Sequence, residues 1–125
     1  MAIMPGGTSL FTTAPAAISL SAQTGSLSGS VTLNWTAVGD DGNTGTASSY
    51  LVRYSASPIT SGTWDAATPV SAGVPAPKPA GQSESMTVTG LNSGSTYYFA
   101  VRAQDEVPNL GAASNSPSAV AAVIP

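Results

Sequence analysis

The chain has 125 residues, which suits one domain with a single hydrophobic core. Only 7% of the residues are charged, and three cations cannot form the basic surface that nucleic acid or anionic lipid requires. The absence of His and Cys removes His-based acid–base catalysis, thiol nucleophiles, disulfides and the usual zinc sites. No apolar run reaches the length of about 18 residues that marks a transmembrane helix, so we expect no membrane insertion.

We expect an N-terminal arm or extra strand over residues 1–16, followed by one β-domain over residues 17–125. Within the arm, Thr8–Thr13 is uncharged and suited to a strand, with Leu10 and Phe11 as its large apolar side chains. Two interpretations stay open. The segment is a loose tail, or it adds as a strand to this domain or to a neighbour.

Two strands are predicted before the first long loop, over residues 17–23 and 30–38. In both, apolar residues alternate with polar ones, which is typical of a strand with one face in a core. The inward positions are Ile18, Leu20, Ala22, Val31, Leu33 and Trp35. We interpret Trp35 as a core residue rather than a ligand platform.

The third predicted strand covers residues 49–55 and places Tyr50, Val52 and Tyr54 inward, with Leu51 and Arg53 outward. After it, Pro58 keeps the next segment from being a central strand. Trp64 follows in a short edge segment. We expect its side chain at the rim of the core rather than in a binding site.

A Pro-rich loop, residues 74–81, is expected to stiffen a crossover between two sheets, with docking into a partner's aromatic groove as the alternative. Residues 83–89 then form a strand with Met86 and Val88 inward, and residues 118–124 form the last strand.

The most informative stretch runs from residue 91 to residue 103. Leu91 precedes a turn at Gly94, and Tyr97 then opens an alternating strand, which is the pattern of a tyrosine corner. In that device the Tyr hydroxyl bonds to backbone upstream and locks the turn. The stretch resembles the Leu-x-Pro-Gly-Thr-x-Tyr-x-Val-x-Val motif of fibronectin type III domains, with Ser93 in place of Pro and Ser95 in place of Thr.

The resemblance implies an all-β fold, a seven-stranded immunoglobulin-like β-sandwich of fibronectin type III type. Trp35 matches the buried Trp that ends the family's second strand, and residues 49–55 match its third strand. The run from Gly39 to Trp64 looks like the variety found in bacterial secreted enzymes and surface proteins. The resemblance implies that the domain is not an enzyme. Because such modules occur in secreted and surface proteins, the expected location is extracellular or on the cell surface.

Two functions follow from the resemblance and the composition. The first is a non-catalytic module for spacing or adhesion. The alternative is a self-assembling structural subunit, such as a surface filament or a virion surface protein, that uses its N-terminal arm or a sheet edge. In both cases the expected partner is protein, including another copy of the chain, and no feature of the sequence supports carbohydrate.

Acidic residues lie in two loops that the family's topology places at one end of the sandwich. The loops hold Asp40 and Asp41, and Asp105 and Glu106, respectively. Calcium binds several such oxygen ligands, so a calcium site is one hypothesis. The alternative is a set of solvated loop acids that cap turns. We expect no other cofactor.

The outward face of the sheet is a second candidate. In the family, Leu51, Arg53, Tyr98 and Arg102 fall on adjacent strands and one face. A guanidinium over Tyr98 would form a cation–π pair, and the four side chains would form a contact surface. The alternative is that they only keep an exposed sheet soluble.

Overall fold

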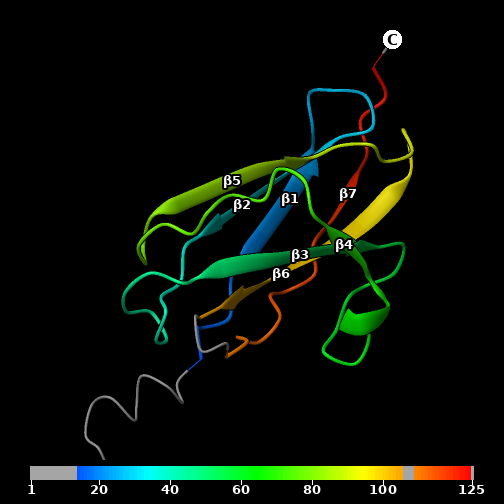
Figure 1. Ribbon diagram of the computed structural model, residues 1–125. Coiled ribbons are helices and arrows are strands. Elements are labelled where there is room, and N and C mark those ends of the chain that lie inside the picture. The colour runs from blue at the N-terminus through cyan, green and yellow to red at the C-terminus, as the bar shows by residue number, and fades with distance from the viewer. Residues whose placement is uncertain (1–13, 106–108, 125) are drawn as a thin grey trace, which may run out of the picture.

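The structure is a computed structural model that describes residues 14–105 and 109–124. Its strands form two antiparallel sheets that face each other (Figure 1). One sheet has the order β1-β2-β5 and the other β4-β3-β6-β7. The strands are β1 Leu20–Thr24, β2 Val31–Thr36, β3 Ser49–Ser55, β4 Thr68–Val70, β5 Ser83–Val88, β6 Thr96–Gln104 and β7 Ser118–Val120. The predicted seven-stranded all-β sandwich is confirmed.

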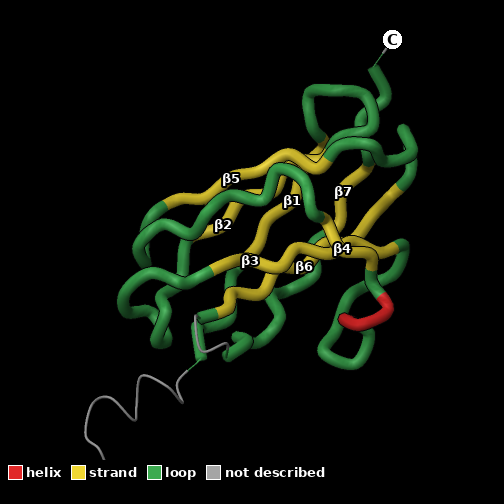
Figure 2. Tube along the Cα trace, in the orientation of Figure 1, coloured by secondary structure: helices red, strands yellow, loops and turns green. Residues whose placement is uncertain are grey.

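A single helical turn, η1 (Trp64–Ala66), lies outside the strands, between β3 and β4 (Figure 2). The last strand is shorter than predicted, because the chain leaves β6 after Val120. Instead, the carbonyl of Ala121 accepts the N–H of Gly94 at 2.8 Å, and that of Ala122 accepts the N–H of Gly29 at 2.8 Å. These bonds tie the end of the chain to two turns.

The main core lies between the sheets and is built from the alternating inward residues of both. Its largest fully buried side chains include Leu33 on β2, Val52 on β3 and Phe99 on β6. Trp35, 4% exposed, packs edge-to-face against Tyr50 of the opposite sheet, with ring centroids 5.1 Å apart. The prediction that Trp35 is a core residue is confirmed.

The edges of the sheets are covered or short. Along β1, the side-chain amide of Asn115 accepts the N–H of Leu20 and donates to its C=O, both at 2.8 Å, in place of a neighbouring strand. Edge strand β4 is three residues long and carries Pro69. Residues 71–79 run beside β5. Ser71 lines a hollow with Val88, and the Lys78 N–H donates to the side chain of Glu84 on β5. Such edges resist pairing with another chain.

Candidate functional site

The outer face of the four-stranded sheet carries a second, small core around Trp64. Trp64 is 3% exposed and packs with Ile59, Ala67 and Ala100, and Leu51 lies against this cluster. We call the segment that supplies most of it, residues 57–67, the Trp64 cap. It folds back over β3 and β6, which is why Ala100 is fully buried although it points away from the main core. Trp64 is therefore not at the rim of the core.

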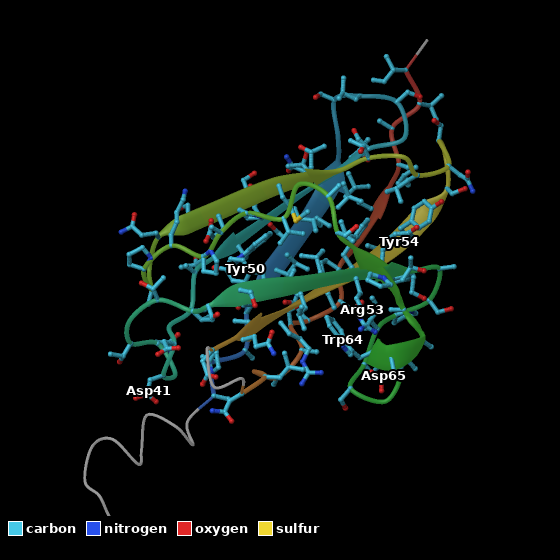
Figure 3. The ribbon with its side chains drawn as sticks, viewed as in Figure 1. Asp41, Tyr50, Arg53, Tyr54, Trp64 and Asp65 are labelled. Carbon is cyan, nitrogen blue, oxygen red and sulfur yellow. The ribbon has the colours of Figure 1, made fainter. Side chains whose placement is uncertain are left out.

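Both outward arginines contact the cap. The guanidinium of Arg53 lies 4.8 Å from the centre of the Trp64 ring and that of Arg102 lies 5.3 Å from it, within cation–π range. Figure 3 shows Arg53 directly beside Trp64. The aromatic partner of the arginines is thus Trp64, where the sequence predicted Tyr98.

Hydrogen bonds also hold both guanidinium groups within the domain. Arg53 donates to the backbone carbonyl of Trp64 at 2.9 Å, and Arg102 donates to that of Gly111 at 2.7 Å. Tyr98 and Leu51 are half-buried on the same face. These four side chains do lie on one face, but the arginines bind the chain's own backbone, so the face is largely a packed surface. Its role in contacting a partner stays a prediction.

Strand or helix periodicity does not predict the cap, because loop residues follow no period. The available signal was two large apolar residues, Ile59 and Trp64, in a loop otherwise rich in Ser, Thr, Pro and Gly. Opposite them, Leu51 and Ala100 lie on adjacent strands and point outward. Apolar residues on the outer face of a sheet, together with large apolar residues in a nearby loop, indicate that the loop covers that face.

A buried carboxylate joins the two sheets. Glu84 on β5 is 2% exposed, and its Oε2 accepts hydrogen bonds from the Tyr50 hydroxyl at 2.9 Å and the Lys78 N–H at 2.8 Å. Burial raises the pKa of Tyr50 well above its ordinary value, and the hydrogen bond and charge of Glu84 raise it further, while the Trp35 indole acts in the opposite direction. The strand period that places Met86 and Val88 inward places Glu84 inward too.

The tyrosine corner is confirmed. The Tyr97 hydroxyl accepts the backbone N–H of Asn92 at 3.0 Å, and Gly94 has a φ of 84°, a value that few side-chain-bearing residues adopt. Leu91 is buried at the start of the turn, and Tyr54 packs edge-to-face on the Tyr97 ring at 5.5 Å. These residues hold the turn that leads into β6.

The proposed calcium ligands are only partly in view, since Glu106 falls outside the described residues. Asp105 is 2% exposed, and its carboxylate accepts hydrogen bonds from the backbone N–H and the side-chain amide of Asn109. Asp41 lies in a tight turn closed by backbone bonds with Thr44. Within residues 14–105 and 109–124, no three acidic side chains come together as a metal site. The calcium site stays a prediction.

Leu10 and Phe11 of the predicted arm also lie outside the described residues. The described chain begins at Ala14, whose carbonyl accepts the N–H of Gly42, while the carbonyl of Gly42 accepts the N–H of Ala16, both at 3.1 Å. Residues 14–16 therefore already lie against the loop between β2 and β3. No helix in the described part of the chain is long and apolar enough to cross a membrane.

Two stacked antiparallel sheets locked by a tyrosine corner define an immunoglobulin-like β-sandwich. The family model for the fibronectin type III domain matches residues 13–117. The chain therefore belongs to the fibronectin type III family, whose members are generally non-enzymatic modules that mediate protein–protein contacts and occur in extracellular or surface proteins.

Among solved structures, the chain is similar to domains A168-A170 from titin, at 21% identity and a TM-score of 0.57. The match covers 88% of this chain and 33% of the titin chain, so the chain spans about a third of that structure. A second similar structure is the sensor domain of the anti-sigma factor RsgI4 from Pseudobacteroides cellulosolvens, at 14% identity, 86% and 96% coverage and a TM-score of 0.46. No curated protein matches the chain.

Proposed function

We propose that this fibronectin type III domain is a non-catalytic module that spaces or attaches parts of an extracellular or cell-surface protein, with a bacterial surface as its setting. The observation that carries the proposal is the placement of the two ends. Residue 14 lies beside the β2–β3 loop, and residues 121–124 lie at the opposite end of the sandwich (Figure 1). A chain that enters at one end and leaves at the other separates its neighbours by the length of the sandwich.

The interior supports a stiff spacer. Glu84 and Tyr50 join the two sheets through a buried hydrogen bond, and Asn115 closes the sandwich on the β1 side. The Trp64 cap covers one outer face. Strand β6 has nine residues, which corresponds to a length of about 30 Å. A rigid body of that length keeps its neighbours at a defined separation.

The test uses the absence of native cysteine. Single cysteines at Ser26 and Asn43, both exposed and at opposite ends, accept spin labels without any competing thiol. Pulsed electron resonance should give one narrow distance distribution centred at about 30 Å or more. A broad or multimodal distribution would rule out a rigid spacer. For attachment, the purified protein should bind isolated cell envelopes, and loss of that binding on mutation would locate the adhesive surface.

The alternative, a self-assembling filament or virion surface subunit, relies on the N-terminal arm or a sheet edge. Among the described edges, the Asn115 side chain takes up the backbone N–H and C=O of Leu20 on β1, and residues 71–79 flank β5. These features favour the spacer over edge pairing. Deletion of residues 1–13 tests the arm directly: a filament would become monomers in light scattering, whereas a spacer would keep its size.

A further inference from the structure

The edge strands β1 and β7 belong to different sheets and lie next to each other along one rim of the sandwich. Leu20, at the start of β1, bonds to Asn115, which lies just before β7. Thr24, at the end of β1, bonds to Val120 at the end of β7. Residue numbers therefore rise in the same direction along both strands, and Figure 1 shows the two arrows pointing to the same end of the sandwich.

Side chains, not a backbone ladder, make the hydrogen bonds along this rim. In the described part of the chain, β1 pairs only with β2 and β7 only with β6. The Asn115 amide instead accepts the Leu20 N–H and donates to the Leu20 carbonyl, both at 2.8 Å. One side chain can take both groups because an amide carries a donor and an acceptor. At the other end of the rim, the Thr24 hydroxyl donates to the Val120 carbonyl at 2.8 Å.

Asn115 is an exposed residue and belongs to neither hydrophobic cluster, so packing does not explain its place. Leu20, which it holds, is 5% exposed and belongs to the main core. On the inner side of the sheet edge, β1 is joined to β2 by five residue pairs. The Asn115 amide is therefore the counterpart of that ladder on the outer side of β1.

The direction of tension follows from the spacing role proposed above, on which this inference rests. A spacer is pulled by its neighbours at residue 14, before β1, and at residue 124, after β7. These two points lie at opposite ends of the sandwich (Figure 1). Because the strands are parallel, tension draws β1 toward one end and β7 toward the other, and the strands slide past each other. The bonds at Leu20 and Thr24 then stretch together, and such bonds resist more than bonds that break one after another.

The segment after β7 is bonded on two sides, so it does not peel away first. The Ala121 N–H donates to the Ser95 carbonyl at 2.9 Å, next to β6. The Ala122 N–H donates to the Ser30 carbonyl at 3.1 Å, next to β2. Because a bond on each side keeps this segment from swinging out, tension at residue 124 passes along the chain into β7.

We propose that Asn115 and Thr24 resist tension between the two ends of the domain. Asn115 is the main residue, because it makes two of the three bonds at this rim. Unfolding under force is governed by the unfolding rate, and bonds that break when β1 slides raise its barrier. The role goes beyond spacing, because the module then keeps its length under tension as well as at rest.

The experiment holds the full chain between handles at its two ends in optical tweezers and records the unfolding rate at constant force. Asn115→Asp keeps the acceptor for the Leu20 N–H but replaces the donor to the Leu20 carbonyl by an oxygen. The unfolding rate should rise about tenfold, as expected when a bond that breaks in the transition state is lost. Asn92→Asp, the same change at another exposed position, should leave the rate unaltered.

A second pulling direction separates resistance to tension from general stability. Cysteines at Asn43 and Ser57, both exposed, place the handles at the two ends of β3, and no native thiol competes. Strand β3 pairs with β4 and β6, so this tension does not slide β1 past β7. In this direction Asn115→Asp should change the unfolding rate by less than about twofold.

Thr24→Val is the second variant. It removes one hydroxyl at an exposed position without changing the shape of the side chain, so it keeps the experiment decisive if Asn115→Asp does not fold. Its end-to-end unfolding rate should rise by a smaller factor, because no carboxylate is brought against a carbonyl.

Two results would overturn the proposal. One is an end-to-end unfolding rate that neither variant changes. The other is an equal rise in both pulling directions, which would give Asn115 only a share in the general stability of the fold. Either result combined with a single narrow spin-label distance would leave the rigid spacer standing, whereas a broad distance distribution would reject the spacer itself.

Discussion

The two tryptophans are buried to nearly the same extent but in different ways. Trp35 is 4% exposed between the sheets, where side chains of both sheets surround it. Trp64 is 3% exposed outside the four-stranded sheet, where the loop that carries it folds back over one sheet. Burial alone therefore does not tell how much of the fold depends on a side chain. That dependence follows instead from the number of strands and loops that pack against the side chain.

This difference extends to the partners of the two rings. Trp35 packs on Tyr50, which itself bonds to Glu84, so three strands from both sheets converge there. Trp64 instead contacts Arg53 and Arg102, two residues that are only half-buried. We expect loss of the first ring to weaken the whole sandwich and loss of the second to open one loop.

The largest effect is expected for Trp35→Ala. Removal of a core Trp costs on the order of 3–5 kcal/mol, a large share of the roughly 5–15 kcal/mol that stabilises a domain. Equilibrium unfolding in urea should show the loss as a lower midpoint, or no folded baseline at all. A loss below about 1 kcal/mol would mean that Trp35 does not hold the two sheets together.

Trp64→Ala should cost less, about 2–3 kcal/mol, because the loop collapses onto the sheet and the arginines turn to water. Hydrogen exchange should speed up at residues 57–67 while β2 and β5 keep their protection. Asp65→Ala, an exposed change in the same helical turn, is the control and should leave exchange unaltered. Equal loss of protection in both sheets would show that the cap is not a separate unit.

The main core could be predicted from the sequence and the cap could not, because only strands carry a local pattern of inward and outward residues. Strand alternation is local, so Val31, Leu33 and Trp35 on β2 could be assigned from neighbouring residues alone. The cap depends on where a loop lands, which no period encodes. Ala100 points away from the main core, yet it is fully buried because Trp64 covers it.

Two other differences have similar causes. Glu84 follows the inward period of β5, but a carboxylate in a core is costly without partners. One partner, the Tyr50 hydroxyl on β3, is distant in sequence, and the other, the Lys78 N–H, lies in the Pro-rich loop, whose path no strand period predicts. The end of β7 was overestimated because Ala121 and Ala122 are apolar like strand residues. Their backbone bonds go to turns at Gly94 and Gly29 instead.

Tyr50→Phe tests the link between the sheets. It leaves the buried Glu84 carboxylate with one donor fewer, which should cost about 1–3 kcal/mol at neutral pH. Because the pKa of Tyr50 is raised in the folded state, its proton stabilises the fold below the ordinary tyrosine pKa of about 10, and this stability is lost as pH rises above that value. Unfolding free energies between about pH 8 and pH 11 should fall less steeply in Tyr50→Phe than in the native chain. Parallel curves would contradict this role.

Tyr97→Phe should have a smaller effect of about 1 kcal/mol, because the Asn92 N–H that loses its acceptor is exposed and can bond to water. Both this change and Tyr50→Phe remove one hydroxyl from a tyrosine, so their comparison contrasts a buried bond to a carboxylate with an exposed bond to a backbone N–H. A chemical denaturation midpoint that does not move would mean that the corner bond contributes nothing to stability.

The smallest effect is expected from calcium. If the acidic loops bind it, calcium at a concentration equal to its dissociation constant stabilises the domain by about 0.4 kcal/mol and raises the melting temperature. Asp40→Asn combined with Asp105→Asn should abolish that rise. Because Asp105 bonds to Asn109, the double variant should also be less stable without calcium, so each protein is compared with itself in calcium and in chelator. Superimposable melting curves of the native chain in the two conditions would leave Asp105 with only the structural role that its bonds to Asn109 already give it.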